Sequence, residues 1–133
     1  MTENDVQQKV MLYQLLLAQL EELKKQAESI QARYMELEAS RLALEDIKKA
    51  KEGSETLIPL GSGIFIDGKI KKGDVLMNVG AGVLARRPIA DVSKDLETKK
   101  EELEGFSNKL QEEMVGTINK INEIGGQLEK EMK

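Results

Sequence analysis

The chain has 133 residues, of which 33% are charged and only 3% are aromatic, and its formal net charge is -4. Because it contains no Cys and no His, thiolate nucleophiles, disulfides, imidazole bases and the usual zinc ligands are excluded. With two Phe, two Tyr and no Trp, the large side chains that dominate compact cores are scarce. Leu, Ile and Val at regular spacing must therefore supply most of the stability.

Charged residues of both signs are interleaved along the chain, and no basic block is present that would neutralise a phosphate backbone. The first residues are polar and acidic, unlike a secretory signal, and no apolar run approaches the ~20 residues that span a bilayer. We therefore expect a cytoplasmic chain with neither nucleic acid nor membrane as a partner.

Apolar residues between positions 6 and 48 recur alternately three and four residues apart, as in a heptad repeat. One line of this seam contains Val6, Tyr13, Leu20, Ala27 and Tyr34, and the adjacent line contains Leu16, Leu23, Ile30, Leu37 and Leu44. Lys9 and Arg41 are the polar exceptions among these positions. The spacing predicts a coiled-coil helix over residues 1–52, ended by Gly53 in the left-handed conformation.

The period changes between residues 53 and 87, where short apolar and β-branched runs at 57–60, 64–66, 74–79 and 83–85 are separated by glycine-containing turns. The pattern predicts four short strands in two β-hairpins. Both faces of these strands carry apolar groups, and an isolated sheet of this size is marginal in water. We therefore expect the hairpins to pair with other subunits through Leu57, Ile58, Leu60, Ile64, Phe65, Ile66, Val75, Met77, Val79 and Val83.

Helical spacing returns at Pro88, which suits the first turn of a helix, and predicts a second coiled-coil helix over residues 88–133. Its expected seam contains Ile89, Val92, Leu96, Leu103, Phe106 and Leu110, with Lys99 as a polar exception, followed after a shift of phase by Met114, Ile118, Ile121, Leu128 and Met132. Four glycines, at positions 105, 116, 125 and 126, each weaken this helix by about 1 kcal/mol relative to Ala.

Two helices of similar length joined by short strands predict a mainly α fold, a long antiparallel two-helix coiled coil with two central hairpins as an oligomerisation base. Position i is expected near position 140 minus i, which brings the two chain ends together. The apolar residues near these ends exceed what a two-helix seam covers, and they predict a partner-binding tip. The predicted tip residues are Val6, Val10, Met11, Leu12, Leu15, Ile121, Ile124, Leu128 and Met132. In the alternative interpretation the second helix bends, and these residues only complete the local seam.

The stretch GSETLIPLGSGIFI at residues 53–66 and the stretch VGAGV at residues 79–83 resemble the alpha class of archaeal prefoldins. The resemblance covers the whole chain in architecture and is most specific in these strand segments. Two hairpins between the helices are typical of the alpha class, because the beta class has one.

The resemblance implies an ATP-independent chaperone without cofactors, a hexamer of two alpha and four beta subunits whose hairpins form β barrels. Unfolded or nascent client chains would bind at the coiled-coil tips and pass to a group II chaperonin. An alpha-like paralogue of this family forms filaments, and a structural coiled-coil scaffold or filament is the main rival interpretation. An enzyme is not expected.

Two motifs have a catalytic or cofactor interpretation. Residues 80–85 match the loose dinucleotide-binding pattern Gly-x-Gly-x-x-Ala, but no helix opens within the motif, so a hairpin turn is favoured. Acid pairs such as Glu21-Glu22 and Glu101-Glu102 would suit acid-base catalysis. On amphipathic helices such pairs more often form solvated faces and pair with Lys one turn away, which is the interpretation we favour.

Overall fold

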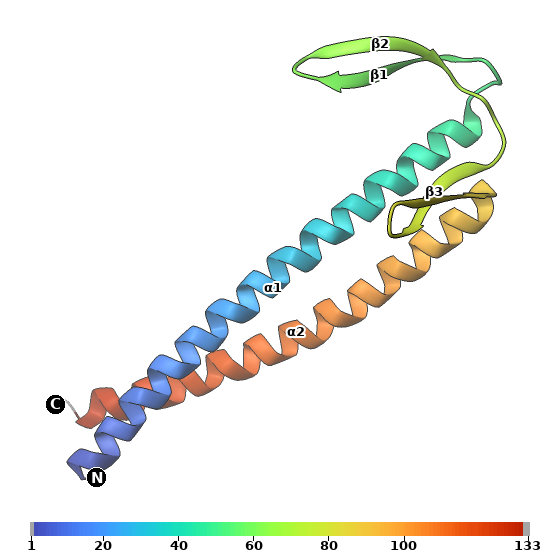
Figure 1. Cartoon of the computed structure of the whole chain (residues 1–133). Coiled ribbons are helices and arrows are strands. Elements are labelled where there is room, and N and C mark those ends of the chain that lie inside the picture. The colour runs from blue at the N-terminus through green and yellow to red at the C-terminus, as the bar shows by residue number, and fades with distance from the viewer. Residues whose placement is uncertain (1, 132–133) are drawn as a thin grey trace. The chain divides into compact units, whose positions relative to one another are not determined.

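A computed structural model describes residues 2–131 of the chain, and Met132 of the predicted tip lies outside them. The elements in order are α1 (Glu3–Lys49), β1 (Glu55–Gly61), β2 (Ile64–Lys69), β3 (Val75–Gly80), β4 (Val83–Arg87) and α2 (Ile89–Glu131), as Figure 1 shows. The predicted mainly α fold with two central hairpins is confirmed.

The chain divides into two compact units. The terminal unit contains the described parts of Met1–Tyr34 and Glu102–Lys133, and the hairpin unit contains Met35–Glu101. In the terminal unit the two helical segments run antiparallel, with the beginning of α1 and the end of α2 at the same end of the unit (Figure 1). The hairpin unit contains all four strands together with the end of α1 and the beginning of α2.

Helix α1 begins with reciprocal hydrogen bonds between Thr2 and Asp5. The Asp5 N–H donates to Thr2 Oγ1, and the Thr2 N–H donates to Asp5 Oδ2, each over 3.2 Å. This arrangement is a capping box, which satisfies backbone donors that the first helical turn leaves unpaired. The hydrogen bond from Thr2 also lowers the pKa of the Asp5 carboxyl.

The other end of α1 lies before the predicted residue. The helix stops at Lys49, with Lys48 and Lys49 placed favourably at the negative end of the helix dipole. Gly53 has the expected positive φ, of 77°, but its N–H donates to the Ile70 carbonyl over 2.8 Å. Gly53 therefore opens the first hairpin and does not cap the helix.

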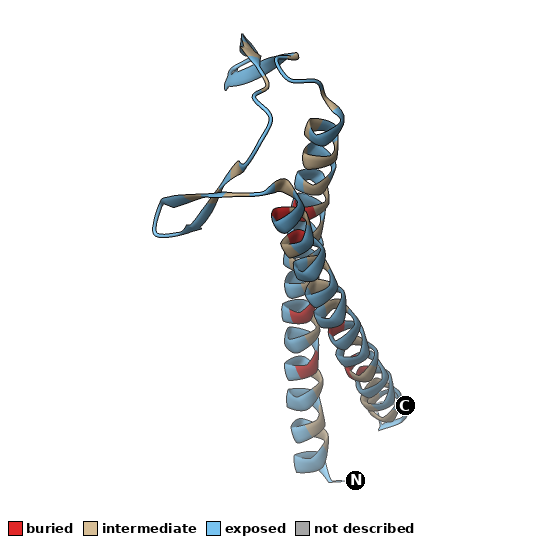
Figure 2. Cartoon of the chain, turned by 90° about the vertical axis from the view of Figure 1, so that its right-hand side faces the viewer, coloured by how far each residue is buried: buried red, intermediate tan, exposed pale blue. Residues whose placement is uncertain are grey.

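The seam of α1 follows the predicted heptad repeat. Each position from Val6 to Leu44 that belongs to the three-four series is buried or half-buried, including the polar exceptions Lys9 and Arg41. Leu16, Leu23 and Leu37 are the most deeply buried, and they lie among the red segments of Figure 2. The spacing of apolar residues predicted the seam correctly here, because few apolar residues outside the seam compete with it in the second half of this helix.

The predicted seam of α2 is wrong at three positions and in its phase shift. The buried and half-buried positions run without interruption from Leu96 through Lys100, Ser107 and Thr117 to Leu128. Lys99, Phe106 and Ile118, which the prediction placed in the seam, are exposed instead. A continuous helix turns each neighbouring residue away by about 100°, so it cannot slip by one residue to bury a more apolar side chain. The seam therefore keeps its period and accepts polar residues.

The helices also pair in a slightly different register from the predicted one. In the terminal unit Lys9 Nζ donates to Gln127 Oε1, and Tyr34 Oη donates to Glu104 over 3.2 Å. In the hairpin unit Lys100 pairs with Glu38 over 2.6 Å. The residue numbers of these pairs add to between 136 and 138, whereas the prediction was 140. The difference arises because α1 ends at Lys49 and not at residue 52.

The two hairpins share one turn design. The central residues are Ser62-Gly63 in the first and Ala81-Gly82 in the second, and all four have positive φ between 50° and 77°. Positive φ at both central residues is the mark of a type I′ turn, which matches the twist of the flanking strands. Gly61 and Gly80 precede these turns, also with positive φ, at a register shift in each ladder.

Strand β2 is longer than predicted, because Asp67 and Gly68 lie inside it and pair with Leu57 and Thr56. A Cβ at Gly68 would lie 2.7 Å from Cδ1 of Ile58, so the missing side chain lets Ile58 pack across the strand. A glycine inside a strand often marks such a close approach. The sequence prediction treated it only as a turn signal.

Candidate binding surfaces

The first candidate surface lies on α1 near its N-terminus, and we name it the α1 outer face. It consists of the exposed residues Val10, Met11, Leu12, Leu15 and Leu17. Met11 and Leu15 are the most exposed, at 69% and 65%. They are one helical turn apart. Around the helix Met11 lies about 140° and Leu15 about 100° from the seam residue Leu16, so both side chains point away from α2.

The α1 outer face is also free of charge. Residues 10–20 include no Asp, Glu, Lys or Arg, although a third of the whole chain is charged. The nearest charged residues along the helix are Lys9 and Glu21. Several exposed apolar side chains on an uncharged helical segment of this length are typical of a binding surface.

The structure divides the predicted tip residues into two groups. Val10, Met11, Leu12 and Leu15 belong to the exposed α1 outer face. The seam side of the helix pair holds Val6, Ile124 and Leu128, which are half-buried, and Ile121, which is buried. Leu17, which the spacing also places outside the seam but which the predicted tip did not include, is exposed as well.

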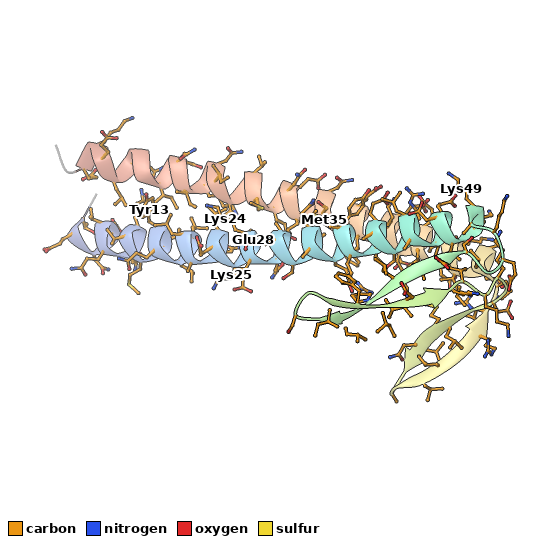
Figure 3. The ribbon with its side chains drawn as sticks, turned by 90° about the horizontal axis from the view of Figure 1, so that it is seen from above. Tyr13, Lys24, Lys25, Glu28, Met35 and Lys49 are labelled. Carbon is orange, nitrogen blue, oxygen red and sulfur yellow. The ribbon has the colours of Figure 1, made fainter. Side chains whose placement is uncertain are left out.

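The seam beside the α1 outer face is closed by specific contacts. Tyr13 lies on the side of α1 that faces α2 (Figure 3), and its ring lies 3.4 Å from the place that a Cβ at Gly125 would occupy. One turn away, the amide of Gln127 accepts a hydrogen bond from Lys9. The small residue at position 125 thus makes room for the Tyr13 ring, and the apolar groups of α2 near this end fill the seam.

The second candidate surface is formed by the hairpins. Of the ten residues predicted to join subunits, eight are exposed and Val75 and Met77 are half-buried. Leu76 and Leu84 are also exposed, and the prediction left them out. These apolar residues are concentrated on short strands whose sheets have only two members in the described part of the chain. Such sheets are marginal on their own.

The β3–β4 hairpin turns one face towards its own chain. Val75, Met77, Ala85 and Arg87 alternate with exposed neighbours and are half-buried, and they pair across the two strands. The Arg87 guanidinium hydrogen-bonds Asp95 in the first turns of α2 and contacts the Met77 sulfur over 3.4 Å. This ion pair lowers the pKa of Asp95 and raises that of Arg87. Only the opposite face of this hairpin is open.

The β1–β2 hairpin is open on both faces. All seven residues of β1 are exposed, and in β2 only Gly68 is half-buried. One face carries Leu57, Pro59 and Phe65, and the other carries Ile58 and Ile66, which are cross-strand partners. Large apolar residues exposed on both sides of a two-stranded sheet indicate a surface that another chain covers.

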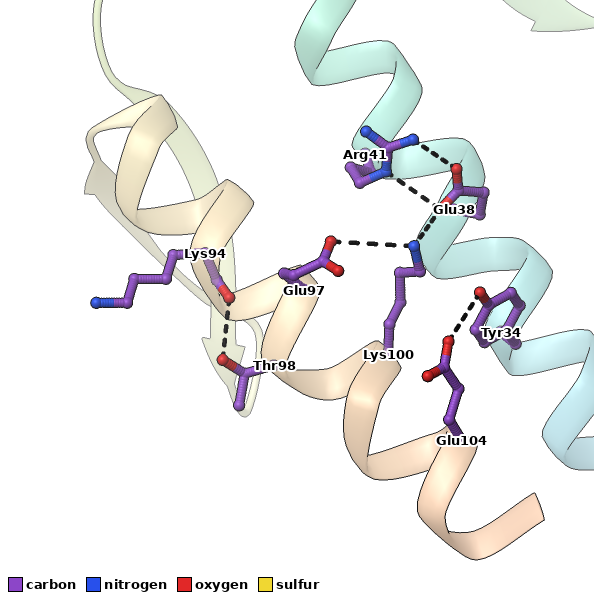
Figure 4. A network of polar contacts seen from close by, with 8 residues as sticks. All are labelled: Tyr34, Glu38, Arg41, Lys94, Glu97, Thr98, Lys100 and Glu104. Carbon is purple, nitrogen blue, oxygen red and sulfur yellow. Dashed lines mark hydrogen bonds and ion pairs between the residues drawn. The ribbon is translucent and has the colours of Figure 1, made fainter. Parts of the chain in front are cut away.

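A charged layer holds the helices together in the hairpin unit (Figure 4). Glu38 accepts hydrogen bonds from Arg41 at Oε1 over 2.6 Å and at Oε2 over 3.1 Å, and Lys100 Nζ also approaches Oε2, to 2.6 Å. These bonds, that from Arg41 first, lower the pKa of Glu38 to about 2. Arg41 and Lys100 occupy seam positions, so the two cations and Glu38 form a polar contact where apolar residues would be usual. A single polar layer of this kind specifies register at some cost in stability.

The dinucleotide interpretation of residues 80–85 is wrong. Gly80 and Val83 close the turn between β3 and β4, and α2 begins only at Ile89. No helix N-terminus therefore faces the glycines, which a pyrophosphate site requires. The preferred interpretation, a hairpin turn, is confirmed.

Residues 2–131 contain no cluster of three or more side chains that could ligate a metal ion. Neither of their helices contains a stretch that is long and apolar enough to cross a membrane.

Comparison with known proteins decides the family. A family model described as prefoldin subunit matches residues 16–133. The chain belongs to the prefoldin family. It is 32% identical to the prefoldin subunit alpha of Methanothrix thermoacetophila over 109 residues, which are 81% of this chain and 71% of the relative. It is 31% identical to that of Pyrococcus horikoshii over 114 residues, 84% of this chain and 77% of the relative.

The fold is also similar to a solved prefoldin structure. A filamentous PFD from Methanocaldococcus jannaschii, determined by cryo-EM, matches with a TM-score of 0.73. The match covers 91% of this chain and 98% of that chain at 24% sequence identity. At this identity the likeness supports the fold alone. The family model and the alpha-subunit relatives confirm the predicted resemblance to the archaeal prefoldin alpha class.

Prefoldins are non-enzymatic chaperones that assemble with other prefoldin subunits, and membership gives this chain a chaperone role. The exposed hairpins fit that assembly, because most of their apolar side chains are exposed. The α1 outer face is a separate apolar surface, on the terminal unit.

Proposed function

We propose that this prefoldin subunit is an ATP-independent holdase that binds unfolded or nascent chains through the α1 outer face. The observation that supports this is the uncharged, exposed set Val10, Met11, Leu12, Leu15 and Leu17 on a helix whose seam is already filled. A client segment with apolar side chains would remove this surface from water, at about 25 cal/mol per Å² of apolar area.

Several features of the face suit a variable partner. Met and Leu side chains have several rotatable bonds, and Met in particular adapts to irregular surfaces. The absence of charge between Val10 and Leu20 means that neither acidic nor basic clients are repelled. Each contact of a single subunit is small, so useful affinity requires several subunits to hold one client at once. Weak single contacts also keep release fast.

The seam residues of the predicted tip have a conditional part in this proposal. Val6, Ile121, Ile124 and Leu128 contact a client only if the helix ends separate. The glycine pair at 125 and 126 lowers the cost of such separation, because each Gly weakens its helix by about 1 kcal/mol relative to Ala. The α1 outer face needs no separation and is the primary site.

The remaining parts of the proposal follow the resemblance to the alpha class. The subunit would join a hexamer of two alpha and four beta subunits through its hairpins, in the cytoplasm, and pass clients to a group II chaperonin. The hairpin exposure described above supports the assembly step, since it supplies apolar area on both faces of β1 and β2.

A suppression assay tests the client site. The assembled protein is mixed with a chemically unfolded client, and light scattering reports aggregation. We expect the double variant Met11→Ser and Leu15→Ser to lose most of the suppression, because it removes the two most exposed side chains of the face. The unchanged hairpins should leave the mass of the assembly unaltered.

The chain contains a matched control for this variant. Met35 and Leu42 lie on the same helix, are 62% and 51% exposed, and are not part of the α1 outer face. The double variant Met35→Ser and Leu42→Ser removes the same two residue types and should suppress aggregation as the parent does. Equal loss in both variants would show that general surface hydrophobicity, and not this face, holds the client.

The second candidate function is a structural filament or scaffold. The observation that favours it is the fold similarity to a filamentous PFD, together with a β1–β2 hairpin that is open on both faces. In a filament, the mass of the purified chain would rise continuously with concentration. A holdase assembly would instead reach one fixed mass, so sedimentation velocity at several concentrations separates the two candidates.

A further inference from the structure

The seam of the terminal unit is poorly filled at two positions where its residues are small. By the observed register, Ser107 of α2 lies opposite Ile30 of α1, and Ala27 of α1 lies opposite Leu110 of α2. Ser107 and Ala27 are half-buried at seam positions, where a coiled coil usually places larger apolar side chains. One small residue on each helix therefore leaves space beside the seam.

Two open cavities occupy this space, and because they share the lining residues Gln31 and Ser107 we treat them as one seam groove. Their volumes are about 190 and 330 Å³. A water molecule takes up roughly 30 Å³ in the liquid, and sites for small molecules begin at about 300 Å³, so each cavity suits one side chain. The apolar lining residues come from both helices and are Ala27, Ile30, Leu103, Leu110 and Met114.

The rim of the seam groove is polar, and its charges are negative. Gln31, Asn108 and Gln111 are exposed amides, which can both donate to and accept from a peptide backbone. Glu104 lines the first cavity and Glu28 the second, whereas none of the described residues that line either cavity is Lys or Arg. Complementary charge selects between partners, so the groove favours a basic segment over an acidic one.

We propose that the seam groove is a second binding site for client chains, which takes an extended segment with neighbouring apolar and basic residues. An apolar side chain of the client enters a cavity, its backbone pairs with the amides of the rim, and its Lys or Arg side chains lie near Glu28 and Glu104. The groove is separate from the α1 outer face, and it depends on the proposed client binding. It adds a preference by charge that the uncharged α1 outer face does not have.

Photo-crosslinking of the assembled protein tests the site. The probe is a short soluble peptide of Lys, Leu and Gly in which a photoreactive analogue replaces one Leu, and mass spectrometry identifies the cross-linked residues. We expect cross-links to both the seam groove and the α1 outer face. A lack of cross-links to the seam groove would overturn the inference, whereas a lack at the α1 outer face alone would refute only the client site proposed there.

The variant Ser107→Leu separates binding from folding. Its larger side chain fills space that both cavities share, so it should stabilise the helix pair and yet lower the cross-links to the seam groove about ten-fold, as expected when one apolar side chain loses its site. Phe106→Ser, at the neighbouring exposed position, should leave these cross-links unchanged, as should Met11→Ser with Leu15→Ser. Unchanged cross-linking in a folded Ser107→Leu variant, or an equal loss in Phe106→Ser, would contradict the site.

A second peptide, with Glu in place of each Lys, tests the preference by charge. It should cross-link to the seam groove about five-fold less than the Lys peptide does. Glu28→Gln with Glu104→Gln should reduce this difference, and Glu104→Gln keeps an amide oxygen that can accept from the Tyr34 hydroxyl. The control, Glu21→Gln with Glu113→Gln, removes the same charge from the same two helices outside the groove and should preserve the difference. Equal cross-linking of the two peptides to the parent would refute the choice of a basic client segment.

Discussion

The α1 outer face and the β1–β2 hairpin both expose large apolar side chains, but they differ in backbone chemistry. The α1 outer face lies in the interior of the helix, where the backbone groups are bonded within the helix, so a partner meets only side chains, and those of Met11 and Leu15 are flexible. On β2 the backbone itself offers donors and acceptors at fixed spacing. The first arrangement suits partners of many shapes, and the second suits one partner in one register. Exposure alone does not distinguish these roles, whereas the state of the backbone does.

A charged residue on each surface in turn gives the largest expected effect. Phe65→Asp should weaken assembly by about a hundred-fold, because an unpaired carboxylate would be buried against the partner subunit. Leu15→Asp should leave assembly unchanged and reduce client suppression. Sedimentation velocity and light scattering measure the two properties on the same samples. If both variants impaired both properties, the separation of the two surfaces would be refuted.

The reassigned seam of α2 predicts a smaller effect on stability. Ser107→Leu should raise the free energy of unfolding by about 1 kcal/mol, because the half-buried position gains apolar area against α1. Phe106 is 59% exposed, and Phe106→Ser should change the stability by no more than about 0.5 kcal/mol. Urea unfolding followed by circular dichroism measures both. A large loss of unfolding free energy in Phe106→Ser would contradict the reassigned seam and support the one predicted from apolar spacing alone.

The charged layer of the hairpin unit predicts a dependence on pH. The pKa of Glu38 is about 2, against an ordinary value of 4.5, because the ionised carboxyl accepts hydrogen bonds from Arg41 and Lys100. Its stabilising contribution is therefore fully present above about pH 4.5 and is lost as the pH falls towards 2. Glu38→Gln should flatten the loss of stability over this interval, as measured by urea unfolding at a series of pH values.

Glu28→Gln is the control for this measurement, since it removes the same charge from the same helix outside the layer. Its unfolding should follow the pH dependence of the parent. A flatter curve for Glu28→Gln and an unchanged one for Glu38→Gln would contradict the claim that the charged layer stabilises the hairpin unit.

The smallest expected effect concerns the glycine pair near the end of α2. Nothing lies within 4 Å of a Cβ built at Gly126, so Gly126→Ala should stabilise the helix by about 0.5 to 1 kcal/mol. At Gly125 the added methyl meets the Tyr13 ring at 3.4 Å, so part of that gain should be offset. Thermal unfolding compares the two variants. A greater gain in Gly125→Ala would show that the ring does not pack at this point.

Much of the fold was predictable because its signals are local. The heptad spacing of α1 and the Gly-Ser-Gly and Gly-Ala-Gly turns each specify their own structure within a few residues. The seam of α2 was not predictable in this way. Phe106 and Ile118 each lie one residue from the true seam position, and because they are more apolar than the true seam residues, spacing by hydrophobicity selects them instead. The contact of Glu38 with Lys100 was also out of reach, because it depends on a register that an error of two residues destroys.

The candidate surfaces were predictable to different degrees. The hairpin residues stand out in sequence because apolar groups occupy both alternating sets of strand positions. The division of the tip into an exposed face on α1 and a filled seam on α2 needed the structure, since spacing alone does not say which side of an all-apolar turn meets the partner helix. The client-binding role of these residues stays a prediction.

The sequence separation of the contacts has a consequence during synthesis on the ribosome. Strands β1 and β2 pair residues no more than 14 positions apart, from Glu55 with Lys69 inward, whereas Lys9 meets Gln127 across 118 positions. Contacts of low sequence separation close earliest, so the β1–β2 hairpin can close before synthesis of α2 is complete. The nascent subunit thus exposes its β1–β2 hairpin before its two helices can pair. Early binding by another subunit would shorten the time during which the apolar hairpin is exposed to water.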